Sequence, residues 1–70
     1  MWKKGTVDGY TYYAKVYEEG SEYGIKNGRI SKLEIRKDGT ILYNYDRGLD
    51  FNRLDADGKA AYRKILKQYK

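Results

Sequence analysis

The chain has 70 residues, of which 16% are aromatic and 36% charged, and it carries a formal net charge of +5 with no histidine and no cysteine. This length predicts one domain over residues 1–70, near the lower size limit for a stable core. Without cysteine and histidine there are no disulfides, no thiolate nucleophile, and neither the commonest metal ligand nor the commonest general base. We therefore expect no enzyme, no cofactor and no metal site.

No apolar run approaches the roughly 18 residues that a membrane-spanning helix needs. Residues 1–5 also lack the apolar stretch that follows the basic start of a secretory signal. We expect a soluble, cytoplasmic protein that does not bind a membrane. Because aliphatic residues are few, some of the nine tyrosines must fill the core.

Three turn dipeptides punctuate the first forty residues: Asp-Gly at 8–9, Asn-Gly at 27–28 and Asp-Gly at 38–39. Each lies between segments rich in tyrosine and β-branched residues, a pattern typical of β-hairpins. They predict four strands in an antiparallel meander. The register of the first hairpin stays open, and with it the face on which Trp2 lies.

The second predicted strand begins with YTYYAKVY at residues 10–17. Its alternation places Tyr10, Tyr12, Ala14 and Val16 on one face, and Thr11, Tyr13, Lys15, Tyr17 and Glu19 on the other. The first set is the more apolar and should face the core. If the strand continues past a bend at Gly20, residues 10–26 form one long bent strand.

The third hairpin can be assigned a register from its side-chain alternation. A two-residue loop would place Leu33 opposite Asn44 and mix polar with apolar residues on both faces. We predict a three-residue loop over residues 37–39, which pairs Ile35 with Ile41 and Leu33 with Tyr43. The polar face then carries Lys32, Glu34, Arg36, Leu42, Asn44 and Asp46.

After the sheet, a covering loop is expected to bring Leu49, Phe51 and Leu54 to the edge of the core. Asp55 is the predicted N-cap of an amphipathic helix over residues 56–69. The apolar stripe of this helix consists of Ala61, Tyr62, Ile65, Leu66 and Tyr69. The predicted fold is α+β: a four-stranded antiparallel β-meander with a C-terminal helix packed on one face.

The excess positive charge lies entirely in this helix and in Lys70, which follows it. Acidic and basic residues balance up to residue 58, and the remainder is Lys59, Arg63, Lys64, Lys67 and Lys70. These cations can complement the helix dipole as an ordinary solvated face, or they can follow the phosphates of a nucleic acid. Lysine outnumbers arginine here, which weakens the phosphate interpretation.

The candidate binding surface combines exposed tyrosines with the basic helix: Tyr13, Lys15, Tyr17, Tyr23, Lys59, Arg63, Lys64 and Lys67. Aromatic rings alternating with a cation on a sheet face are typical of single-strand stacking platforms. Cross-strand pairing or a homodimer contact explains the same pattern. Asp46, Asp50, Asp55 and Asp57 match no calcium-loop spacing.

Two stretches, SEYGIKNGRISKLEI at 21–35 and YNYDRGLDFNRLDADG at 43–58, resemble a family of small proteins of Gram-positive bacteria and their mobile elements. The family has no established activity, so the resemblance lends no site residues. It implies a cytoplasmic protein borne by a phage or a transposon.

Two functions remain open. The first is a small interaction module that binds another protein, as an inhibitor or accessory factor of a mobile element, through the sheet face, an edge strand or the loop at 20–28. The alternative is weak, sequence-tolerant binding of nucleic acid through the basic helix and the exposed tyrosines.

Overall fold

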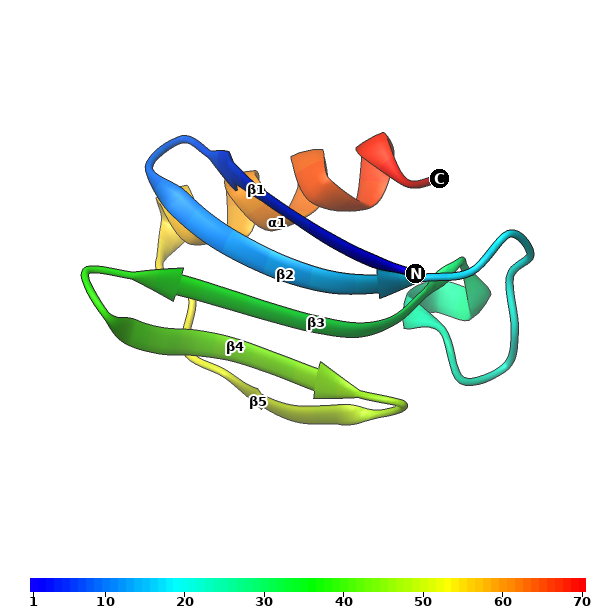
Figure 1. Cartoon of the computed structure of the whole chain (residues 1–70). Coiled ribbons are helices and arrows are strands. Elements are labelled where there is room, and N and C mark those ends of the chain that lie inside the picture. The colour runs from blue at the N-terminus through cyan, green and yellow to red at the C-terminus, as the bar shows by residue number, and fades with distance from the viewer.

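The computed structural model describes all 70 residues and shows a five-stranded antiparallel sheet with one helix behind it (Figure 1). The elements are β1 (Trp2–Val7), β2 (Tyr10–Val16), the 3₁₀ turn η1 (Ile25–Asn27), β3 (Ile30–Lys37), β4 (Thr40–Asp46), β5 (Leu49–Asn52) and α1 (Ala56–Gln68). The strands lie in the sheet in chain order. The α+β class and the antiparallel meander are confirmed, but the number of strands predicted was wrong by one.

The first hairpin has a two-residue loop at Asp8 and Gly9, which have φ values of 52° and 85°. Two consecutive positive φ values are the signature of the turn that matches the twist of a tight hairpin. The loop makes Val7 the partner of Tyr10, and this register continues to Trp2 opposite Lys15. Cross-strand partners share a face, so Trp2 lies on the same side as Lys15.

The predicted hairpin at residues 27–28 and the long strand over 10–26 were both wrong. β2 ends at Val16, and residues 17–29 form a folded loop that contains η1. Inside it the Ser21 amide donates to the Gly28 carbonyl at 3.2 Å. The backbone segments approach so closely at Gly20 and Gly24 that a Cβ atom at either would overlap backbone atoms of residues 27–28. These glycines fold the loop back on itself.

The β3–β4 hairpin has a two-residue loop, with Lys37 opposite Thr40, so the predicted three-residue loop was wrong. A bulge then shifts the register and pairs Ile35 with Tyr43. Ile41, predicted opposite Ile35, is instead the partner of Arg36 and lies on the opposite face, while Tyr43 takes its predicted place on the core side. Leu42, predicted on the polar face, packs against the core instead.

The segment after β4 was predicted as a covering loop but forms the short strand β5. Phe51 is the partner of Asn44 and therefore lies away from the core. Leu49 is 60% exposed, so only Leu54 of the three apolar residues is buried. A tight turn at Arg47, where φ is 60°, reverses the chain early enough for a fifth strand to pair.

The helix follows its prediction closely. The Asp55 carboxylate caps it by accepting from the Gly58 amide at 2.7 Å, and it also accepts from the Tyr10 hydroxyl at 2.7 Å. Ala61 and Ile65 have no exposed surface. The remaining stripe residues pack against the core at its border: Tyr62, Leu66 and Tyr69.

The tyrosines divide between the core and the surface, as the alternation predicted. Tyr10, Tyr12 and Tyr43 are at most 3% exposed. Every buried side-chain polar atom has a hydrogen-bond partner, and the Tyr12 hydroxyl pairs with the Tyr69 hydroxyl at 2.7 Å. These buried phenols therefore supply apolar area without leaving an unpaired polar group.

Substituting Asp55→Ala should lower the melting temperature by on the order of 5 °C at neutral pH, because the cap and the Tyr10 bond are both lost. Those bonds hold the pKa of Asp55 below its ordinary value. The stabilisation is therefore complete above about pH 4 and disappears as the pH falls through the lowered pKa. Thermal melts of both proteins from neutral to acid pH should converge. Asp57→Ala, in the first turn without a cap bond, is the control and should shift the melt less.

Candidate functional site

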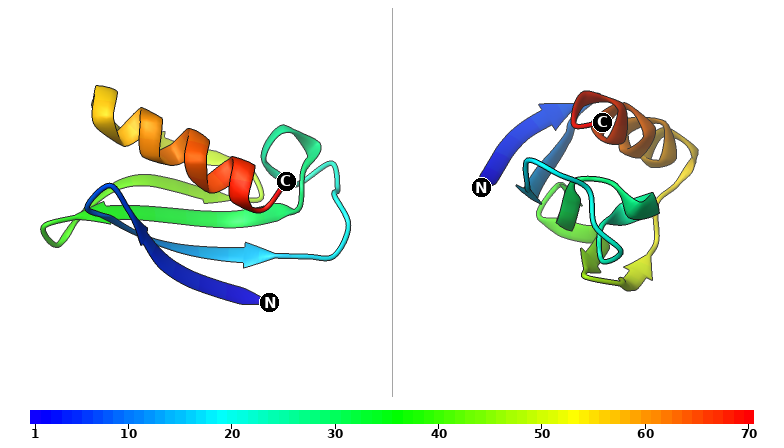
Figure 2. Two further views of the ribbon diagram at one scale, coloured as in Figure 1. Left: turned by 90° about the horizontal axis from the view of Figure 1, so that it is seen from above. Right: turned by 90° about the vertical axis from the view of Figure 1, so that its right-hand side faces the viewer.

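The face of the sheet opposite α1 has no covering element (Figure 2). We call it the open face. Successive side chains of a strand point to opposite faces, so its residues are those that alternate with the core residues along each strand, together with their cross-strand partners. They are Trp2, Lys4, Thr6, Thr11, Tyr13, Lys15, Lys32, Glu34, Arg36, Ile41, Asn44, Asp46 and Phe51. This face mixes aromatic rings with charges of both signs.

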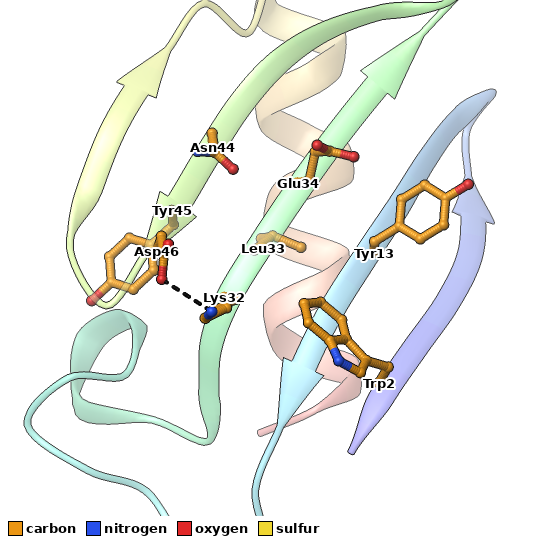
Figure 3. Close-up of a pocket in the computed structure, with 8 residues that line it drawn as sticks. All are labelled: Trp2, Tyr13, Lys32, Leu33, Glu34, Asn44, Tyr45 and Asp46. Carbon is orange, nitrogen blue, oxygen red and sulfur yellow. Dashed lines mark ion pairs between the residues drawn. The ribbon is translucent and has the colours of Figure 1, made fainter.

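A groove of about 410 Å³ crosses the open face. Figure 3 shows Trp2 and Tyr13 on one side of it, and Asp46 with Lys32 toward the other. The Lys32 ammonium lies 3.5 Å from the Asp46 carboxylate. Trp2 is 61% exposed, which is high for a tryptophan on a sheet face. The groove thus has an aromatic wall and a charged wall.

Cations flank the aromatic rings of the open face. The Tyr13 ring has the Lys4 ammonium 5.4 Å from its centroid and the Arg36 guanidinium at 5.7 Å. Arg36 also donates to the Glu34 carboxylate at 2.7 Å, and this bond raises its pKa. Both distances are within the range of cation–π attraction, which favours this placement of the cations beside the ring.

Lys15, Tyr17 and Tyr23, all predicted as binding residues, line a second depression beside the groove. The Lys15 ammonium lies 5.6 Å from the Tyr17 ring centroid, and its interaction with the Tyr17 hydroxyl lowers the pKa of that tyrosine. Tyr23 is 49% exposed, and its carbonyl accepts from the Tyr45 hydroxyl at 2.9 Å. The structure therefore brings the four predicted sheet and loop residues, including Tyr13, to one side of the molecule.

The predicted basic residues of the helix lie on the other side of the sheet. All of them are exposed: Lys59, Arg63, Lys64 and Lys67. Lys64 pairs with Asp8 at 2.7 Å. Because the sheet separates these cations from the outer tyrosines, one flat ligand cannot contact both sets. The predicted surface is in fact two surfaces.

Trp2 and Phe51 are open-face residues that the sequence analysis did not assign there. The signal for Trp2 was present, because a two-residue loop at Asp8-Gly9 fixes the register that pairs it with Lys15. No comparable signal existed for Phe51, since β5 was not predicted. No group of three His, Cys, Asp or Glu side chains lies close enough to hold a metal ion.

The fold and this surface define a small α+β domain with one face of its sheet uncovered. The chain belongs to the DUF7678 family, a domain of unknown function whose family model matches residues 1–70. No curated protein and no solved structure matches the chain. None of its helical segments is both long enough and apolar enough to cross a bilayer.

Proposed function

We propose that this protein is a small, non-enzymatic interaction module that binds another protein through the open face. The observation that carries the proposal is the single tryptophan, Trp2, which is 61% exposed beside Tyr13 at a groove of the uncovered sheet. Tryptophan, tyrosine and arginine are the residues that most often dominate binding energy at protein interfaces. Burying the Trp2 indole against a partner removes apolar surface from water.

The charges of the groove favour a protein over a nucleic acid. Glu34 and Asp46 both line it, and their carboxylates would repel phosphates. Glu34 also pairs with Arg36, and Asp46 with Lys32, so these two cations of the open face are partly neutralised. An aromatic centre surrounded by charges of both signs matches the anatomy of protein–protein interfaces.

The edge of β1 offers a partner strand a place to pair. Met1 and Val16 exchange backbone hydrogen bonds of 2.8 and 3.0 Å. Along an antiparallel pair of strands, residues that bond to the partner strand alternate with residues that do not. The backbone N–H and C=O groups of Trp2, Lys4 and Thr6 therefore point away from β2. A strand added there would have alternate side chains on the open face, next to the groove. We propose this strand addition as the binding mode.

The cellular setting is also part of the proposal. The stretches at 21–35 and 43–58 resemble small proteins of Gram-positive bacteria and their mobile elements. This resemblance supports a cytoplasmic protein that acts as an accessory or inhibitor of a mobile element. The partner would then be a protein of that element or of its host.

Affinity capture from source cells, compared between matched variants, tests the proposal. Trp2→Ala with Tyr13→Ala should weaken the complex about thirtyfold or more, since two central aromatic anchors are removed. Lys59→Gln with Lys64→Gln, on the helix, is the control and should retain the same partner. With purified partner, Trp2 emission should move to shorter wavelength. A partner held equally well by all three proteins would refute the open face as the interface.

Two further measurements test the competing occupants. Anisotropy of labelled single-stranded DNA, duplex DNA and RNA should show no binding that depends on Trp2 and Tyr13. Binding that falls steeply with salt and is lost in that double variant would assign the open face to nucleic acid instead. Sedimentation should show a monomer, and a dimer broken by the same substitutions would make a second copy the occupant.

A further inference from the structure

A second cavity, of about 640 Å³, lies on the helix side of the molecule. It is formed where the loop around η1 meets the C-terminal end of α1, two segments that lie side by side in Figure 2. Its size falls in the range of small-molecule sites. The groove of the open face shares no lining residue with it.

The charged side chains that line this cavity are all positive. Its cations are Lys26, Arg29, Arg63, Lys67 and Lys70, and no acidic residue lines it. None of the five belongs to any of the ion pairs of the protein. Like charges gathered in one concave site repel one another and raise the local concentration of anions. The cavity is therefore a place where a ligand with several negative charges is stabilised.

One of these cations is held in place by the backbone. The Arg29 Nε group donates to the Tyr17 carbonyl at 2.9 Å. This bond uses one of five N–H donors, so the others stay available to a ligand. Two arginines in the set matter because the guanidinium fork matches phosphate oxygens with two parallel hydrogen bonds.

The interior wall of the cavity is apolar. Ile25 and Ile30 are 6% and 2% exposed, and Leu66 and Tyr69 border the same space. The Tyr69 ring is fixed edge-on against Tyr12, with 6.0 Å between centroids, and its hydroxyl is bonded to the Tyr12 hydroxyl. A simple inorganic anion would leave this wall uncovered. A ligand that fills the cavity needs an apolar group as well as its charges.

We propose that this cavity binds a nucleotide, with the phosphates against the arginines and lysines and the flat base against the apolar wall. A nucleoside triphosphate carries several negative charges on a body of suitable size, and both arginines can bind its phosphate oxygens. Lys26 and Asn27 also hold positive φ values of 53° and 59°. Such strained backbone at non-glycine residues is often retained where a loop serves a site.

Isothermal titration calorimetry of the purified protein with ATP and GTP tests the proposal, and pyrophosphate and adenosine are the comparison ligands. The nucleotides should bind, and each comparison ligand should bind about tenfold more weakly or worse, since it offers only half of the contacts. Pyrophosphate binding as strong as that of ATP would overturn the role of the apolar wall. No binding of either nucleotide would overturn the site.

Matched charge variants of the helix locate the binding. Arg63→Gln with Lys67→Gln removes two cavity cations and should weaken nucleotide binding about tenfold or more. Lys59→Gln with Lys64→Gln removes two helix cations that do not line the cavity, so affinity should change little. Equal loss in both pairs would mean attraction by net charge only and would overturn the proposal.

Two further measurements distinguish nucleotide binding in this cavity from binding at the open face and from binding of a nucleic-acid strand. Amide NMR shifts on addition of ATP should concentrate in residues 25–30 and 63–70, while Trp2 emission stays constant. Short single-stranded DNA or RNA that binds while free nucleotides do not would assign the cations to a nucleic-acid strand and overturn the proposal. Because Trp2 reports the open face alone, failure here leaves the test of protein binding independent.

Discussion

Replacing Ile65 by alanine should lower the free energy of unfolding by about 2–5 kcal/mol. Ile65 is completely buried in the C-terminal half of α1 and belongs to the hydrophobic core. Truncation removes buried methyl groups and leaves a cavity that the sheet cannot fill, because the strands are held by their hydrogen bonds. A chain of this length is expected to have a total stability of roughly 4–10 kcal/mol, so the loss would be a large share.

Urea unfolding followed by circular dichroism measures this loss. Leu49→Ala is the matched control, because Leu49 is also a large aliphatic residue but is 60% exposed on β5. Its stability should stay within about 0.5 kcal/mol of the parent. If both substitutions cost the same, Ile65 would not be the central contact between the helix and the sheet.

The elements that sequence reasoning predicted well are those with a local signal. The helix has a capping aspartate at its start, a stripe at helical spacing and charges on its other face, and its bounds agree to within one residue. Strand β2 alternates over seven residues, so its core face was clear. Both kinds of signal depend only on neighbours in the chain, which is why the tertiary structure did not override them.

The errors arose where contacts between distant residues decide the structure. The loop over 17–29 is stabilised by close backbone approach at Gly20 and Gly24, which the turn rule for Asn27-Gly28 does not describe. The bulge in β4 is likewise invisible to an analysis that tests loop lengths alone. Strand β5 was missed because its four residues are too few for a clear period.

The same distinction between local signals and distant contacts applies to the two candidate sites. Tyr13, Lys15 and Tyr17 were assigned to the outer face from alternation, and the cross-strand pairs confirm that placement for Tyr13 and Lys15. Tyr17 lies just beyond the end of β2, where it lines a depression together with Lys15. The cationic cavity could not be predicted, because it joins residues 26–29 with residues 63–70. Their proximity depends on the fold of the loop, for which the sequence has no periodic signal.

That loop gives the second large effect: Gly24→Ala should lower the free energy of unfolding by about 2–3 kcal/mol. A Cβ atom at this position would overlap the backbone carbonyl oxygen of Gly28. Gly24 itself has φ −80° and ψ 156°, which alanine adopts without strain. The cost therefore comes only from the overlap, and no flexible side chain can move away to relieve it. The loop must shift, and it carries the buried Ile25 with it.

Gly48→Ala is the matched control, because a Cβ atom there has nothing within 4 Å. Its φ is not positive, so alanine should leave stability unchanged or raise it by up to about 1 kcal/mol through a less flexible unfolded chain.

Hydrogen exchange locates the part of the structure that Gly24→Ala destabilises. The Gly28 amide donates to the Ile25 carbonyl at 2.9 Å. It should lose more protection from exchange than the amides that form hydrogen bonds between β2 and β3. Unchanged protection at Gly28 would mean that the loop tolerates the methyl group and that close approach does not determine its fold.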